Sequence, residues 1–185
     1  MDRKLTVFAA TGISAAAVGV LFKAAGAPPN IESLMPFILA TSMVLGPAYG
    51  LVNAVLVRSL YDAYMSWAGW WTVMTAGSYG VVGLCGGLAA RYKRSWSRIE
   101  LALFAAVLTI VYDILTMLVF GFVLGIPFPA LVVGQVPFTI NHLLGNVVLC
   151  FIFAPMLLKA LRGYVEEPVR TRLVVAAPAP TKQER

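Results

Sequence analysis

Long uncharged apolar runs are the feature that most limits how this chain can fold. Of its 185 residues, 60% are hydrophobic and 12% are charged, whereas soluble domains average about 25% charged residues. Runs of this kind are typical of transmembrane helices, and the alternation expected of transmembrane β-strands is absent. The sequence therefore predicts a small all-α membrane protein that crosses the bilayer several times.

The apolar runs divide into six predicted helices. The second run is short: at 1.5 Å per residue it covers only about 20 Å, less than the roughly 30 Å hydrocarbon core. Fusing it with the third run would give about 50 Å, which is too long, and Gly46-Pro47 supplies a turn and a proline that can open the next helix. The predicted helices are 5–25, 34–46, 47–66, 70–91, 99–124 and 135–161.

The basic residues support this division. With six spans, 12 of the 14 Lys and Arg residues share the side that holds both termini, and the opposite loops have none. With five spans, Arg3 and Lys4 would be separated from the other ten. The positive-inside rule therefore predicts six transmembrane helices within residues 1–162, in the plasma membrane with both termini cytoplasmic. Residues 163–185 are predicted to form a mostly disordered cytoplasmic tail.

Composition and motifs exclude several other classes of protein. The net charge of +6 fits cytoplasmic membrane loops better than a nucleic-acid partner. There is no phosphate-binding glycine loop, no G-x-S-x-G and no H-E-x-x-H, so we expect neither an enzyme nor a bound cofactor. A single histidine argues against a metal site. The N-terminal run resembles a signal peptide, but residues 5–22 are long enough to span a bilayer, so we expect a retained first helix.

Polar side chains inside the predicted helices converge at one depth. Arg58 and Asp62 fall in the outer half of the third helix, Asp113 near the middle of the fifth, and His142 and Asn146 in the outer and middle parts of the sixth. Such groups are costly in lipid, so each should face protein or a water-filled cavity. The i,i+4 spacing lets Arg58 pair with Asp62 and places His142 and Asn146 on one face. These groups are predicted to surround a space that opens toward the outside.

Explanations without a bound ligand remain open for each of these residues. Arg58 and Asp62 can form a buried ion pair that only fixes helix packing. Asn141, turned about 100° from His142, can make an interhelical hydrogen bond, and His142 can be a satisfied core histidine. The tryptophans between the third and fourth helices can form an interfacial aromatic belt or a stacking platform for a flat ligand. The convergence favours a substrate site built from Arg58, Asp62, Trp67, Trp70, Trp71, Tyr79, Asp113, Asn141, His142 and Asn146.

Small residues form stripes at helical spacing on two of the predicted helices. Such stripes let another helix approach closely. In the fourth helix they favour internal packing, and the residues are Gly77, Gly80, Gly83 and Gly87. In the first helix, internal packing and docking of a separate membrane subunit are both open, and the residues are Ala9, Gly12, Ala15, Ala16 and Gly19.

Several of these segments together resemble the substrate-binding S components of energy-coupling-factor (ECF) vitamin transporters. The resemblance covers about residues 1–162. It rests on "GPAYG" opening the third helix and "YD" near its end, on "GSYGVVGLCGGL", on "YDILT", and on "PFTINHLLGN" in the sixth helix.

The resemblance implies capture of a vitamin or related micronutrient from outside the cell. It also implies partners: a transmembrane coupling subunit, which the small-residue motif of the first helix would contact, and two cytoplasmic ATPases that supply energy. Substrate would be bound by the fourth to sixth helices and the outer loops, with Glu32 able to close over it. "MDRKLT" lacks the histidine motif of the nickel and cobalt members, so the substrate is left open. The alternative is a membrane structural or assembly protein whose polar residues only pack helices.

Overall fold

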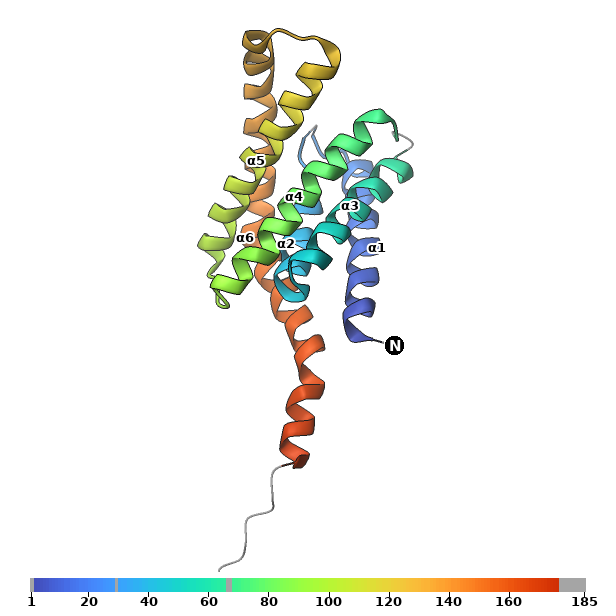
Figure 1. Cartoon of the computed structure of the whole chain (residues 1–185), viewed down its shortest axis with the longest axis vertical. Coiled ribbons are helices and arrows are strands. Elements are labelled where there is room, and N and C mark those ends of the chain that lie inside the picture. The colour runs from blue at the N-terminus through green and yellow to red at the C-terminus, as the bar shows by residue number, and fades with distance from the viewer. Residues whose placement is uncertain (1, 29, 66–67, 177–185) are drawn as a thin grey trace, which may run out of the picture.

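The computed structural model describes residues 2–28, 30–65 and 68–176, and the part of the chain that it describes is a bundle of six helices (Figure 1). The helices are α1 (Arg3–Ala24), α2 (Leu34–Leu45), α3 (Pro47–Tyr64), α4 (Trp70–Tyr92), α5 (Arg98–Leu124) and α6 (Phe128–Ala176). The all-α prediction is therefore confirmed, and five of the six predicted helices lie close to their observed bounds.

Local sequence signals set where the helices begin and end. The side chain of Asp2 accepts a hydrogen bond from the backbone N–H of Lys4 at 3.0 Å, which caps α1. Ser97 and Glu100 form a reciprocal capping box at the start of α5. Gly46, at a φ of 96°, ends α2, and Pro47 opens α3. The predicted break at Gly46-Pro47 is therefore present, because a positive φ favours glycine and the first turn of a helix tolerates proline.

The sixth helix begins at Phe128, earlier than the predicted residue 135. Pro129 is tolerated in this earlier part of the helix because it lies in the first turn, where no intrahelical N–H bond is needed. The carbonyl of Pro127 accepts hydrogen bonds from the N–H groups of Ala130 and Leu131, which closes that turn. The helix also continues to Ala176, through part of the predicted tail. Residues 177–185 lie outside the described residues, and the domain boundary at residue 162 remains a prediction.

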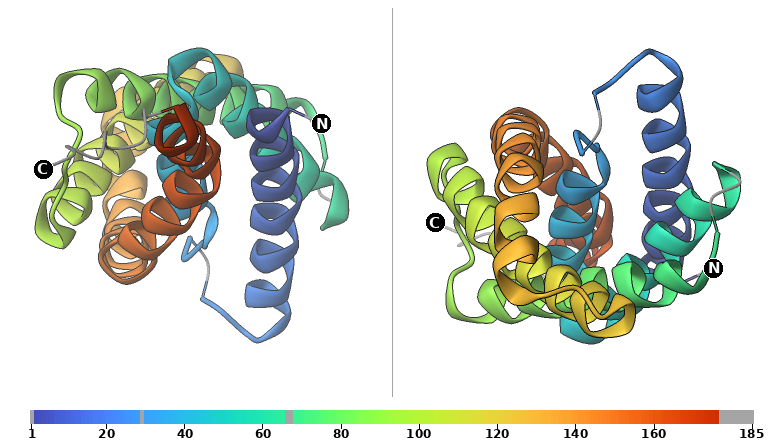
Figure 2. Two further views of the ribbon diagram at one scale, coloured as in Figure 1. Left: turned by 90° about the horizontal axis from the view of Figure 1, so that it is seen from below. Right: turned by 90° about the horizontal axis from the view of Figure 1, so that it is seen from above.

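The short helix α2 occupies the centre of the bundle. Seen along the bundle, it lies between α1 and α6 (Figure 2), and it also packs against α3 and α4. Its side chains are almost all buried, with Leu34, Ile38 and Leu39 fully enclosed. Because α2 has only 12 residues, it does not fill the whole length of the bundle, and this leaves room at one end.

Glycines bring α3 and α4 into close contact. A Cβ atom built on Gly83 would lie 2.6 Å from the carbonyl carbon of Gly50, and closer still to its oxygen. A Cβ on Gly87 would meet the backbone of Pro47 in the same way. Internal packing was the favoured interpretation of this stripe, and the structure shows it for Gly80, Gly83 and Gly87, whereas Gly77 faces open space.

Four helices of the described chain are long and apolar enough to cross a membrane: α1, α4, α5 and the part of α6 up to Glu166. The helix α2 is apolar but shorter, and α3 carries Asn53, Arg58 and Asp62 on its largely apolar length. The start of α1, the turn between α4 and α5 and the C-terminal part of α6 lie at one end of the bundle (Figure 1). We call this the basic end, because it gathers most Lys and Arg residues. The chain is thus a multi-pass membrane protein.

Candidate functional site

A cavity of about 710 Å³ lies at the end of the bundle opposite the basic end. It is bounded by the end of α1, the α1–α2 loop, α3, α4, α5 and the first half of α6, and no residue of α2 lines it. The cavity therefore occupies the space that the short central helix leaves free. Its polar lining residues are Lys23, Asn30, Glu32, Arg58, Thr75, Thr116, Gln135 and His142. Its aromatic lining residues are Trp71, Tyr112, Phe120 and Phe138.

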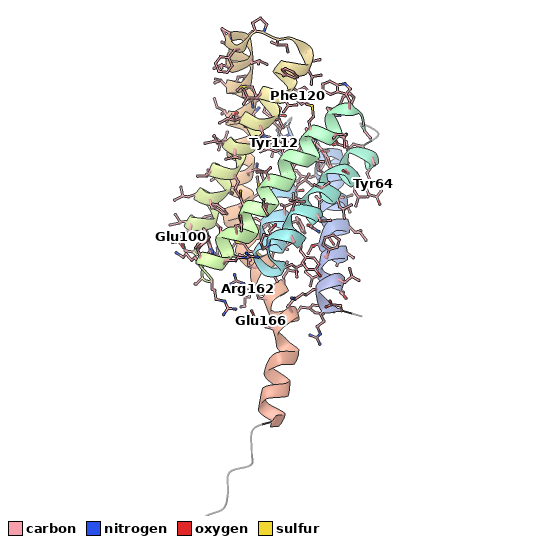
Figure 3. All side chains as sticks on the ribbon, viewed as in Figure 1. Tyr64, Glu100, Tyr112, Phe120, Arg162 and Glu166 are labelled. Carbon is pink, nitrogen blue, oxygen red and sulfur yellow. The ribbon has the colours of Figure 1, made fainter. Side chains whose placement is uncertain are left out.

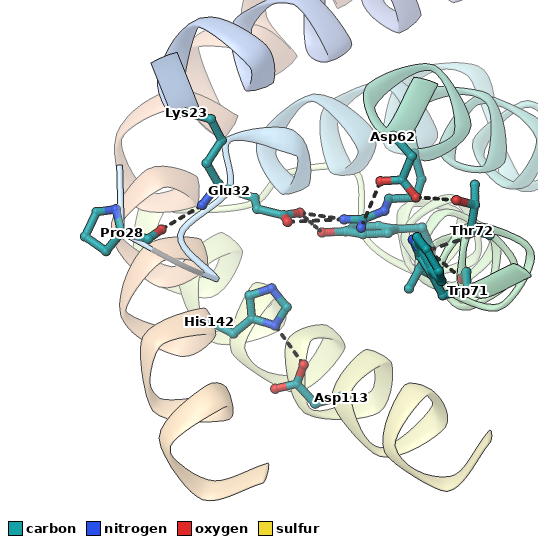
Figure 4. Close-up of polar contacts among 11 residues, drawn as sticks. Lys23, Pro28, Glu32, Asp62, Trp71, Thr72, Asp113 and His142 are labelled. Carbon is teal, nitrogen blue, oxygen red and sulfur yellow. Dashed lines mark hydrogen bonds and ion pairs between the residues drawn. The ribbon is translucent and has the colours of Figure 1, made fainter. Parts of the chain in front are cut away.

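The guanidinium group of Arg58 joins the loop to α3 on one wall of the cavity. It donates two hydrogen bonds to the carboxylate of Glu32, at 3.0 and 3.2 Å, and lies 3.0 Å from Asp62 Oδ1 (Figure 4). The hydroxyl of Thr72 in turn donates to Asp62 Oδ2 at 2.7 Å, and the hydroxyl of Tyr79 donates to Glu32 at 3.4 Å. One cation therefore pairs with two carboxylates, which offsets part of the cost of burying them.

The ring of His142 forms part of the opposite wall and is held by Asp113. Its Nδ1 lies 2.7 Å from Asp113 Oδ1, and both side chains are almost fully buried. The Tyr112 and Phe138 rings meet the imidazole edge-on, with centroids 5.6 and 4.8 Å away. The other ring nitrogen points away from Asp113, toward the side of the α1–α2 loop (Figure 4). Since Nδ1 is committed to Asp113, Nε2 is the atom that can meet a ligand.

Aromatic rings from three helices complete the cavity walls. Trp71 from α4 and Phe120 from α5 both line it, and Trp70 packs against the two of them with centroid distances of 6.0 and 5.3 Å. Tyr112 and Phe120, two turns apart on α5, both lie in the half of the bundle that holds the cavity (Figure 3). Flat apolar faces beside a few fixed polar groups are typical of small-molecule sites.

Three of the predicted site residues line the cavity: Arg58, Trp71 and His142. Three more lie directly behind them, since Asp62 contacts Arg58, Asp113 contacts His142, and the Tyr79 ring lies 6.0 Å from the Arg58 guanidinium carbon. The predicted convergence of α3, α5 and α6 is therefore present in the structure. Whether these residues bind a ligand stays a prediction.

The other predicted site residues do not line the cavity. Asn146 donates a hydrogen bond to Thr109 of α5 at 2.9 Å, which is a packing contact between helices. Asn141 is half-buried, and its side chain makes no hydrogen bond to any described residue. Trp70 supports Trp71 from the rim, and Trp67 lies outside the described residues.

Sequence reasoning missed much of the polar mouth of the cavity. Lys23 was assigned to the first span, but its Nζ reaches the carbonyl of Pro28 at 2.7 Å, and its side chain lines the cavity. Gln135 and Phe138 also line it. Their spacing of i, i+3 and i+7 with His142 was the signal that would have identified one face of α6. Among the described residues, no three His, Cys, Asp or Glu side chains gather as a metal site would require.

The predicted docking stripe on α1 is mostly inside the bundle. Gly12, Ala15, Ala16 and Gly19 are buried, and Ala9 is exposed. A Cβ on Gly19 would lie 2.9 Å from side-chain atoms of Leu34 and Tyr61, so this stripe serves internal packing. Docking of another subunit along it remains a prediction.

Comparison with known proteins gives one match. The family model described as "ECF-type riboflavin transporter, S component" matches residues 4–163, which covers α1 to α5 and the part of α6 that packs within the bundle. Searches of curated proteins and of solved structures returned no match. The family match covers most of the chain and agrees with the all-α bundle and its apolar helices. This chain therefore belongs to the family of ECF-type riboflavin transporter S components.

Proposed function

We propose that this chain is the substrate-capture subunit of an ECF-type transporter and that it binds riboflavin, or a closely related flavin, from outside the cell. The observation that carries the proposal is the cavity of about 710 Å³, which combines aromatic walls with a few fixed polar groups. Sites for ligands of this size usually measure about 300–1,000 Å³. Riboflavin is the vitamin named in the description of the matching family.

The chemistry of the lining matches the two parts of a flavin. The isoalloxazine ring system is flat and aromatic, and Trp71, Phe120 and Phe138 offer rings against which it can pack. Its pyrimidine edge and the ribityl chain carry carbonyl, N–H and hydroxyl groups. Asn30 and Gln135 offer amide groups to meet them.

His142 is the polar group best prepared for binding. Its ring is fixed by the Asp113 contact and by two neighbouring aromatic rings, so little conformational entropy is lost when a ligand bonds to Nε2. Asp113 does not line the cavity and acts through His142, which makes it a positioning residue. The Glu32–Arg58 ion pair similarly fixes the α1–α2 loop beside the ligand.

The orientation in the membrane follows from the charges. We place the basic end, with both termini, in the cytoplasm by the positive-inside rule. The cavity then opens on the outer side, where a vitamin would enter. Energy would come from two partner ATPases through a transmembrane coupling subunit, and we expect α1 to contact that subunit, with Ala9 as the exposed member of its small-residue stripe.

Growth of a riboflavin auxotroph tests this proposal. Cells that lack their own riboflavin uptake would express the chain with a coupling subunit and ATPases, and growth would be measured at limiting riboflavin. His142→Phe should abolish growth, because it removes the Nε2 atom that faces the ligand. Leu144→Phe, an exposed position on the same helix, is the matched control and should grow like the wild type. Membrane levels are measured for both. Failure of the wild type to support growth, or equal growth of the two variants, would contradict the proposal.

A further inference from the structure

A second pocket lies at the basic end of the bundle, far from the cavity described above. Its volume is about 610 Å³, and it forms beside the ends of α2 and α4, where α6 leaves the bundle. Its apolar surface comes from Met43, Val44, Ala90 and Val165. Its charged groups are Arg94, Arg162 and Glu166. None of these residues lines the cavity described above.

The two arginines of this pocket are without partners among the described residues. Arg162 and Glu166 are spaced i,i+4 on α6, a spacing that allows an ion pair, yet no ion pair joins them. Figure 3 shows both at the point where α6 leaves the other helices. Arg94, in the turn after α4, likewise makes no hydrogen bond or ion pair with any residue that the structure describes. Two guanidinium groups, one half-buried (Arg162) and one exposed (Arg94), therefore line one pocket without a partner among the described residues.

The pocket combines two chemistries that a phospholipid also combines. Guanidinium groups match phosphate oxygens in geometry and bind them with paired hydrogen bonds. The apolar side chains beside them suit the first carbons of acyl chains. Basic pockets between transmembrane helices on the cytoplasmic side are a known means of holding anionic headgroups. A free phosphate ion would bind the arginines but would make no favourable contact with the apolar side chains of the pocket.

Glu166 narrows the choice of headgroup. A carboxylate disfavours a bare phosphate monoester by charge, but it accepts hydrogen bonds from hydroxyl groups. A glycerol headgroup on a phosphodiester supplies one negative charge and two hydroxyls. It therefore satisfies the arginines and the glutamate together.

We propose that the pocket between α2, α4 and α6 binds the headgroup of one anionic phospholipid of the phosphatidylglycerol type. The arginines Arg94 and Arg162 hold its phosphodiester, and Glu166 accepts from its glycerol hydroxyls. The lipid then fixes the end of α6 against α2 and α4. This site is independent of flavin binding at the other end of the molecule.

Lipid retention tests the proposal on the full chain. The protein is placed in nanodiscs of phosphatidylcholine with phosphatidylglycerol. It is then released from the nanodiscs under mild activation, and native mass spectrometry measures the lipid that stays bound. The wild type should retain one phosphatidylglycerol, and Arg94→Gln/Arg162→Gln should retain at least tenfold less. The matched control is Arg91→Gln/Arg98→Gln, which removes two exposed arginines from the same end outside the pocket. It should retain lipid like the wild type.

Each other outcome overturns the proposal. Equal loss in both double variants would mean that general surface charge holds the lipid. Equal retention in both would mean that the pocket holds something else, such as the coupling subunit. Displacement of the lipid by millimolar soluble glycerol phosphate would show a site for free phosphate. If the pocket variant is not folded, as judged by its elution profile, Arg94→Gln alone is used and should show a partial loss.

Discussion

The contact between Gly83 and Gly50 makes a prediction about stability that can be worked out from the structure. Gly83→Ala places a Cβ atom 2.6 Å from the carbonyl carbon of Gly50, where ordinary contact begins near 3.4 Å. The obstacle is backbone, so α3 and α4 must move apart. Overpacking costs about 1–3 kcal/mol, and a rigid obstacle favours the upper end. Alanine regains about 1 kcal/mol in helix propensity, so we expect a net loss of about 2 kcal/mol.

Gly77→Ala is the matched control on the same helix. Nothing lies within 4 Å of a Cβ atom at Gly77, so only the propensity gain of up to about 1 kcal/mol remains. The two variants should differ by about 3 kcal/mol in unfolding free energy, with opposite signs relative to wild type. The measurement is unfolding in mixed micelles titrated with sodium dodecyl sulfate. Equal stability of the two variants would refute the close contact of α3 and α4.

Three further predictions concern the cavity and its surroundings. Arg58→Met should destabilise the fold by about 3–5 kcal/mol, because Glu32 and Asp62 lose their buried cation. The thermal midpoint in detergent should fall, and an unchanged midpoint would argue against the ion cluster. Asn146→Leu should cost about 0.6–1.7 kcal/mol through the lost interhelical hydrogen bond. It should leave riboflavin affinity unchanged, so a large affinity loss would place Asn146 in the site after all. Trp71→Leu should weaken riboflavin binding roughly 2- to 10-fold, from about 0.5–1.5 kcal/mol of aromatic contact. An equal loss in Trp70→Leu would mean that the rim, and not the cavity wall, binds the ring.

The sequence was sufficient to predict the helices wherever the end of an apolar run coincided with a helix-breaking glycine or proline. The break at Gly46-Pro47 and the glycine face of α4 are examples, because backbone sterics at glycine and proline act within a few residues. The start of α6 was predicted wrongly, at residue 135 instead of Phe128. Pro129 falls in the first turn of this helix, where proline is tolerated.

The cavity could be predicted only in part, because its lining depends on contacts between helices. The expected depth of each residue in the membrane correctly predicted that Arg58, Asp113 and His142 lie near one cavity. The i,i+4 spacing also predicted the ion pair between Arg58 and Asp62, but not that Asp62 lies behind the cavity wall and only Arg58 lines the cavity. Neither argument could show that Asn146 turns toward Thr109. Rotation of a helix about its axis is set by tertiary packing, and a one-residue difference turns a side chain by about 100°.

Equilibrium binding of riboflavin to the purified full chain is the decisive measurement for flavin recognition by the cavity. Flavin fluorescence is followed while protein is titrated into riboflavin in detergent, with His142→Phe and Leu144→Phe measured alongside. We expect saturable quenching at one flavin per chain, retained in Leu144→Phe and strongly weakened in His142→Phe. Absence of saturable binding by the folded wild type would contradict riboflavin binding by this chain. Identical binding curves for the two variants would contradict the role of His142 in that binding.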